Sequence, residues 1–124
     1  MRRYDPSQAP DPREWLALDE QERMLLVEQH HQRARIKVPD LTAHSIIHAV
    51  VENQLAQNDE PVVRALVRLT KQGLSRHDAI HAIGSVVTTQ IFDALQSKQP
   101  VQRDAYYAEI ETLTADKWLR SNAG

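Results

Sequence analysis

Two histidine pairs at helical spacing constrain this 124-residue chain more than any other feature. His44 and His48 form one His-x-x-x-His motif, and His77 and His81 form a second one 33 positions later. Residues at positions i and i+4 lie one above the other on the same face of an α-helix. Each motif therefore predicts a helix that directs two imidazole rings to the same side.

The apolar residues around both motifs predict helices with one buried face. In the first segment, the two histidines share an arc of about 120° with four aliphatic residues when residues are placed 100° apart; these are Leu41, Ile47, Val51 and Leu55. In the second segment, the face of His77 and His81 also carries Ile80, Gly84, Ile91, Phe92 and Leu95. Gly84 is a poor helix former, so a close helix crossing is expected there. No useful stretch alternates with period two, so the predicted fold class is all-α.

Prolines and capping signals divide the chain into an arm and about five helices. Three prolines in the first 14 residues predict an extended, Pro-rich arm at 1–14, followed by a single helical domain at 15–124. The first helix is expected to begin at Asp19, where Glu22 completes a capping box. The other four are expected at about 41–58, between Asn58 and Gly73, at 75–97 with Ser75 as cap, and at 101–120.

Short connections favour an antiparallel bundle, which brings the histidines together. If the first four helices form a square, the helices at 41–58 and 75–97 are parallel and diagonal, with axes roughly 13 Å apart. Both histidine pairs lie near the N-terminal ends of these helices and so share one layer of the core. The first helix runs the other way, and its last turn adds His30 or His31 to that layer. Adjacent residues point about 100° apart, so only one of them faces inward, and His31 is favoured.

A shared layer of imidazoles predicts a transition-metal site. Neutral imidazole binds zinc, iron, manganese, nickel and copper, and zinc or iron is expected first. The positive end of a helix dipole also helps to keep nearby histidines unprotonated, as a ligand must be. The predicted ligands are His44, His48, His77 and His81. The weaker candidates are Glu52, as a ligand or as a hydrogen-bond acceptor for His48, and the Glu-x-x-His pair of Glu28 and His31.

Two other interpretations of the same histidines stay open. They could form a buried hydrogen-bonded network with Glu52, Asp78 or backbone carbonyls, in a non-catalytic helical interaction or regulatory module. They could also lie at the seam of a homodimer. The sequence names no protein partner, and it contains no nucleophile elbow, His-Glu-x-x-His motif or glycine-rich phosphate loop. No catalytic residue is therefore predicted, and whether the chain is an enzyme stays open.

Composition argues against nucleic-acid and membrane partners. The net charge of −2 supplies no basic field for phosphate backbones. Residues 69–83 have the outline of a helix-turn-helix, but the second helix carries few exposed basic or amide side chains to contact bases. Neither an apolar leader nor an apolar run of about 20 residues is present. With no cysteine in the chain, the bacterial cytoplasm is the expected location.

The residues around both motifs also resemble a known family. The run from His44 to Gln54 and the run from Gly73 to Gly84 are similar to motifs of a family of small bacterial proteins with a domain of unknown function. The resemblance covers roughly residues 40–95. It implies that both histidine motifs belong to one module, and it implies no activity, substrate or ligand.

Overall fold

The computed structural model of the protein describes residues 1–122, and helices are the only regular secondary structure in that range. The seven helices are α1 (Pro12–Ala17), α2 (Glu20–Arg33), α3 (Leu41–Ala56), α4 (Glu60–Lys71), α5 (Arg76–Ser97), α6 (Arg103–Thr112) and α7 (Ala115–Asn122). The all-α class is therefore confirmed, whereas the expected number of about five helices was too low. None of the described helices is long and apolar enough to cross a membrane.

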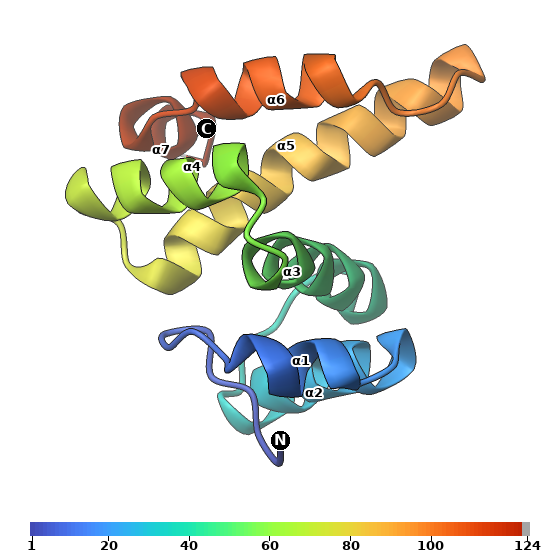
Figure 1. Cartoon of the computed structure of the whole chain (residues 1–124), viewed down its shortest axis with the longest axis vertical. Coiled ribbons are helices and arrows are strands. Elements are labelled where there is room, and N and C mark those ends of the chain that lie inside the picture. Colours follow the sequence, from blue (N-terminus) through green and yellow to red (C-terminus); the bar gives the residue numbers. More distant parts are fainter. Residues whose placement is uncertain (123–124) are drawn as a thin grey trace.

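The helices are stacked along the long axis of the molecule around a central α3. In Figure 1, α1 and α2 lie at one end, α4 to α7 lie at the other, and α3 between them is seen nearly end-on. α3 packs against α1 and α2 on one side and against α4 and α5 on the other. The predicted antiparallel square is thus wrong, because α3 crosses its neighbours at steep angles and contacts α5 directly instead of lying diagonal to it.

Side-chain caps fix the starts of the helices that carry the histidines. Asp19 and Glu22 form the expected reciprocal capping box at the start of α2. The Asp40 carboxylate accepts from the Ala43 amide at 3.1 Å, and the Ser75 hydroxyl accepts from the Asp78 amide at 3.1 Å. These bonds satisfy amides that have no partner within the helix, so they set the register in which α3 and α5 present their histidines.

One unpredicted helix occupies part of the predicted arm. The Asp11 carboxylate accepts from the amides of Arg13 and Glu14, and Pro12 is the first residue of α1. A proline is favoured at that position because its missing N–H would have no intrahelical partner anyway. The last three residues of the expected extended arm at 1–14 therefore belong to α1, and residues 1–11 contain no helix.

The predicted helix at 101–120 is two helices. The backbone at Leu113 is extended (φ −68°, ψ 130°), and the Thr114 hydroxyl accepts from the Lys117 amide at 3.1 Å, which starts α7. The carbonyls that end α6 are satisfied from another helix, because the Arg68 guanidinium donates to Ile110 at 2.7 Å and Leu113 at 3.0 Å. The break is therefore stabilised by a tertiary contact as well as by the threonine cap.

The C-terminal half of α5 departs from the expected buried face. Ile91, Phe92 and Leu95 are 38%, 58% and 73% exposed, although they share the helical face of the two histidines. In Figure 1 this half of α5 runs away from α3 and beside α6, so α3 does not cover it. The main core consequently gathers around the first half of α5, where Ala79, Ile80, Ala82 and Ile83 are almost completely buried.

Gly84 lies at the close crossing of α3 and α5 that its sequence position predicts. A Cβ atom at Gly84 would lie 3.0 Å from Cγ2 of Ile47 and 3.9 Å from Cγ2 of Val51. The first distance is shorter than an ordinary van der Waals contact between carbon atoms, which is about 3.5–4.0 Å. Glycine therefore allows the two histidine-bearing helices to approach each other.

We expect Gly84→Val to destabilise the protein by about 1–3 kcal/mol, the usual cost of overpacking a well-filled core. The larger side chain must push α3 away from α5, because Ile47 already occupies the space. Chemical denaturation monitored by circular dichroism measures the loss. Thr89→Val, on an exposed position of the same helix, is the control and should change stability by less than about 0.5 kcal/mol. Equal stability of the two variants would contradict the close crossing.

Candidate metal centre

All six histidines of the chain gather in one region, supplied by three helices. The last turn of α2 supplies His30 and His31, and the N-terminal halves of α3 and α5 supply one His-x-x-x-His pair each. The closest ring centroids are 4.3 Å apart for His77–His81, 4.7 Å for His31–His44, 4.9 Å for His44–His81 and 5.2 Å for His48–His77. The predicted convergence of three segments on one layer therefore occurs, although the helices cross instead of forming a square.

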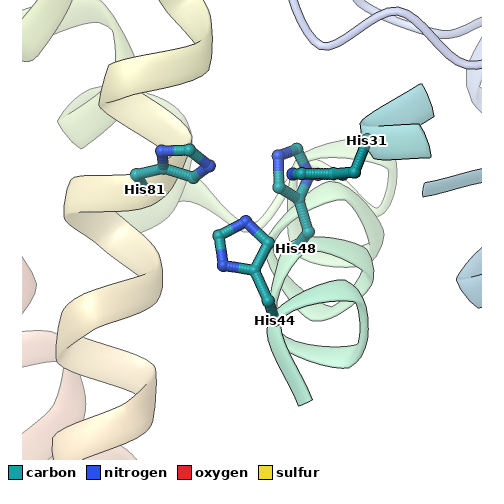
Figure 2. Close-up of side chains that lie close together, drawn as sticks. All are labelled: His31, His44, His48 and His81. Carbon is teal, nitrogen blue, oxygen red and sulfur yellow. The ribbon is translucent and has the colours of Figure 1, made fainter. Parts of the chain in front are cut away.

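Four of these histidines could hold one metal ion. His31, His44, His48 and His81 each offer a ring nitrogen, and these four atoms lie within 4.8 Å of one another. Figure 2 shows the four rings turned toward a common centre, with His31 and His81 on opposite sides of the α3 pair. No carboxylate joins this group within residues 1–122.

The group differs from the predicted ligand set at one position. It contains His44, His48 and His81, and its fourth member is His31, which the sequence ranked as a weaker candidate. His77 is not in the group, although its ring lies beside that of His81. His31 is completely buried, so the favoured member of the His30–His31 pair does face inward.

The two candidate carboxylates lie outside the group. Glu28 accepts a long hydrogen bond of 3.4 Å from the Thr42 hydroxyl, on the exposed surface. Glu52 is 1% exposed and accepts from the Tyr4 hydroxyl, which lies 2.9 Å from Nδ1 of His48. Glu52 is therefore connected to His48 through the Tyr4 hydroxyl. This position is closer to the predicted role of hydrogen-bond acceptor for His48 than to that of a metal ligand.

Hydrogen bonds at Nδ1 set the tautomer of His48. An ionised carboxylate only accepts hydrogen bonds, so the single hydroxyl proton of Tyr4 is donated to Glu52. The Tyr4 oxygen must then accept from His48, and Nδ1 of that ring carries the proton. The other ring nitrogen, Nε2, is left with a free lone pair.

His31 is held in the same tautomer by the backbone. Its Nδ1 lies 2.9 Å from the carbonyl oxygen of Val27, one turn earlier in α2, and a carbonyl only accepts. Nδ1 of His31 is therefore protonated, and Nε2 again carries the lone pair. Metal-binding histidines commonly have this arrangement, in which the second ring nitrogen donates to a carbonyl or a carboxylate.

The histidine layer also contains buried nitrogens without partners. Nε2 is buried and has no hydrogen-bond partner among the described residues in five histidines, namely His31, His44, His48, His77 and His81. A buried polar atom normally makes a hydrogen bond, because leaving it unpaired costs about 1–3 kcal/mol. A cluster of such atoms, two of them with fixed lone pairs, is compatible with a cation site and with a structural histidine network.

A buried ion pair completes the support of His48. Arg76, at the start of α5, donates to both carboxylate oxygens of Glu52 at 2.8 Å and 2.9 Å, and also to the Pro6 carbonyl at 3.0 Å. Burial alone would lower the pKa of Arg76, but its hydrogen bonds to Glu52 raise it. Burial, followed by the charge of Glu52, raises the pKa of Tyr4 well above its usual value, so its hydroxyl stays protonated. These hydrogen bonds join the N-terminal segment, α3 and α5 on the Nδ1 side of His48.

The environment of the cluster favours neutral histidines. Burial, and then the neighbouring rings of His81, His77, His31 and His44, lower the pKa of His48 far below its ordinary value of 6.5. The same two causes lower the pKa of His81 to about 3 and that of His77 to about 4, with Asp78 opposing the shift at His77. Neutral imidazole is the form that binds metal, so the lowered pKa values of His44, His48 and His81 favour the form that a metal site would need.

We expect the metal-free protein to lose stability as the pH falls from about 6.5 toward 4. Over this range the unfolded chain protonates His48, His77 and His81, whereas the folded chain protonates them only at lower pH. Each such histidine adds a slope of about 1.4 kcal/mol per pH unit, with stability higher at higher pH. Urea midpoints at pH 7.5 and 5.0 measure the loss, and His81→Gln should reduce it. A midpoint that does not fall would contradict the assigned protonation.

A cavity gives access to one side of the cluster. It has a volume of about 290 Å³ and lies between α3 and α5, with His44, His48 and His81 in its wall. Ala43, Ser85 and Thr88, which also line it, are exposed and mark its mouth. His31 does not line the cavity, so it closes the opposite side of the group.

Two residues that support the site were not predicted from the sequence. Tyr4 belongs to the arm, and the only signal for it is an aromatic residue in an otherwise polar segment. Arg76 directly follows the cap Ser75, and no local pattern distinguishes it from the other basic residues of the chain. Both contacts join segments more than 20 residues apart, which local patterns do not report. No protein-family model, curated protein or solved structure matches this chain.

Proposed function

We propose that this protein binds a divalent transition metal through His31, His44, His48 and His81. The observation that carries the proposal is the orientation of the ring nitrogens. The four nitrogens lie within 4.8 Å of one another, and at His31 and His48 the hydrogen bonds at Nδ1 leave Nε2 with a free lone pair. Zinc and iron(II) are the metals favoured first, because both accept several imidazole ligands.

A bound metal would draw the four nitrogens closer together. Metal–nitrogen bonds of 2.0–2.1 Å place the ligand nitrogens of a tetrahedral site about 3.4 Å apart, which is less than the 4.8 Å limit of this group. Of the four ligands, His44 and His81 have the most freedom to move, since neither makes a side-chain hydrogen bond within residues 1–122 and both are only half-buried. His31 and His48 form the fixed half of the site.

A comparison of neighbouring histidines tests the proposal. His31→Ala should weaken binding of zinc and cobalt(II) by at least 100-fold, because it removes one ligand and its fixed lone pair. His30→Ala is the matched control: His30 belongs to the same turn of α2 but lies outside the group of four, so its loss should change affinity by less than about threefold. Calorimetric titration measures both. Equal affinities for the two variants would count against these ligands.

The second candidate function is a non-catalytic helical module with a structural histidine network, with or without a homodimer. The ring-to-ring contacts favour it, because many neighbouring rings meet edge to face, the geometry in which aromatic rings attract each other. Under this alternative, His31→Ala lowers the free energy of unfolding. No variant changes metal binding, because the unmodified protein binds no metal. Sedimentation of the untagged protein then decides between monomer and homodimer.

Tyr4→Phe is expected to weaken metal binding by roughly 10- to 100-fold, the usual effect of removing a hydrogen bond that orients a ligand. The change deletes only the hydroxyl that joins Nδ1 of His48 to Glu52 and leaves the ring packed against Trp15. Tyr107→Phe removes a hydroxyl bonded to Asp59 at 2.7 Å, outside the histidine layer, and is the control. Competition with a chromophoric chelator gives both affinities. An unchanged affinity in Tyr4→Phe would show that the hydroxyl does not orient His48.

A further inference from the structure

We infer that the cavity between α3 and α5 admits a small organic monoanion, of the class of short aliphatic carboxylates, whose charged group becomes a further ligand of the metal. The inference rests on the proposed function, because the metal is the group that binds the anion. Beyond the proposed function, the inference names the class of molecule that binds the metal and the cavity through which this molecule enters. Three features of the structure carry it.

The first feature is access to the metal from one side. Three of the four proposed ligands, His44, His48 and His81, line the cavity, so a metal held by them faces it directly. The rings of His44 and His81, both labelled in Figure 2, lie 4.9 Å apart between centroids and form part of the cavity wall. A ligand in the cavity can therefore reach the metal without displacing a histidine.

The second feature is uncompensated charge. The group of four contains no carboxylate, so a divalent ion held by neutral imidazoles keeps its full charge of about +2. The nearest buried carboxylate, Glu52, is already paired with Arg76. Burying an unpaired charge is costly, and an anion that binds the ion removes part of this cost. The site therefore favours an anionic ligand over a neutral or cationic one.

The third feature is the apolar wall of the cavity. Besides the histidines, the lining consists of Ala43, Ile47, Ile80 and Gly84, together with two hydroxyl residues. The Ser85 hydroxyl donates to the Ala82 carbonyl at 2.6 Å, and the Thr88 hydroxyl donates to the Gly84 carbonyl at 2.9 Å. Both hydroxyl protons are thus occupied within α5. No charged side chain lines the cavity, so the ligand carries one charge, at the metal, and a short aliphatic chain along the wall.

Cobalt(II) in place of the native metal gives a direct readout. The cobalt-loaded protein is titrated with acetate, propionate and butyrate, and the visible absorption of cobalt is followed. We expect saturable changes with all three, and affinity should rise by about fourfold for each added methylene group that the apolar wall buries. Butyramide, which has a similar shape and no charge, should leave the spectrum unchanged.

Two substitutions on α5 separate entry through the cavity from binding elsewhere. Ser85→Phe fills the exposed mouth and should weaken butyrate binding at least tenfold, with the cobalt spectrum unchanged in the absence of butyrate. Thr89→Phe lies on the exposed surface of the same helix, does not line the cavity, and should bind butyrate like the unmodified protein.

The failures of the two proposals are distinguishable. A protein that takes up cobalt, but whose spectrum ignores all three carboxylates, overturns the inference and leaves the metal site intact. Equal affinities for acetate and butyrate, or an unchanged affinity in Ser85→Phe, also overturn it. A protein that takes up no cobalt overturns the proposed function and the inference together.

Discussion

Replacing His48 with glutamine is expected to reduce metal affinity by at least ~100-fold, more than the loss of an orienting hydrogen bond alone. His48 is one of the two fixed members of the group of four. It is 2% exposed, its Nδ1 is held by Tyr4, and its ring lies within 5.6 Å of the rings of His31, His77 and His81, measured between centroids. Glutamine keeps most of the volume and removes the imidazole nitrogen. Competition with a chromophoric chelator measures the loss.

His30→Gln is the matched control for this variant, because it changes the same residue type in the same layer but outside the group of four. Circular dichroism must show that both variants keep the helical content of the unmodified protein. If His48→Gln binds metal as tightly as His30→Gln does, then the four nitrogens are not one site.

Replacing Glu52 with glutamine is expected to destabilise the protein by about 3–5 kcal/mol, the range found when one partner of a buried ion pair is removed. The side chains of Glu52 and Arg76 are 1% and 13% exposed, so the guanidinium left behind has little water to solvate it. The change also weakens the acceptor of the Tyr4 hydroxyl, and with it the support of His48. Urea denaturation of the metal-free protein gives the value.

A surface ion pair provides the control for Glu52. Arg64 pairs with Glu60 and Glu111, but its side chain is 55% exposed, so Arg64→Gln should cost far less stability than Glu52→Gln. The double variant Glu52→Leu/Arg76→Met removes both buried charges and should recover much of the stability lost in Glu52→Gln. Similar losses for Glu52→Gln and Arg64→Gln would contradict the buried pair.

The sequence predicted the histidine layer because its signals are local. A spacing of four residues places the two histidines of each pair on one face of their helix. The caps at Asp19, Asp40 and Ser75 set where α2, α3 and α5 begin. The same logic would have found α1, since Asp11 before Pro12 repeats the combination of a capping residue and a first-turn proline. It would also have found α7, where Thr114 is a cap inside an apparently continuous helix.

The arrangement of the helices could not be predicted in this way. Short loops suggested antiparallel neighbours in a square, but a glycine contact can instead fix a steep crossing, as Gly84 does against Ile47. The crossing makes α3 and α5 direct neighbours and brings His31 rather than His77 into the group of four. Tyr4 and Arg76 act through contacts across the fold, so no pattern of neighbouring residues marks them as parts of the site.

The measurement that tests the metal site most directly is elemental analysis of untagged protein, purified without chelators and without a nickel column. The four histidines with two fixed tautomers predict about one transition-metal ion per chain. A metal content near zero, unchanged after incubation with zinc and with iron(II) under anaerobic conditions, would contradict the site and leave the histidines as a structural layer of the core.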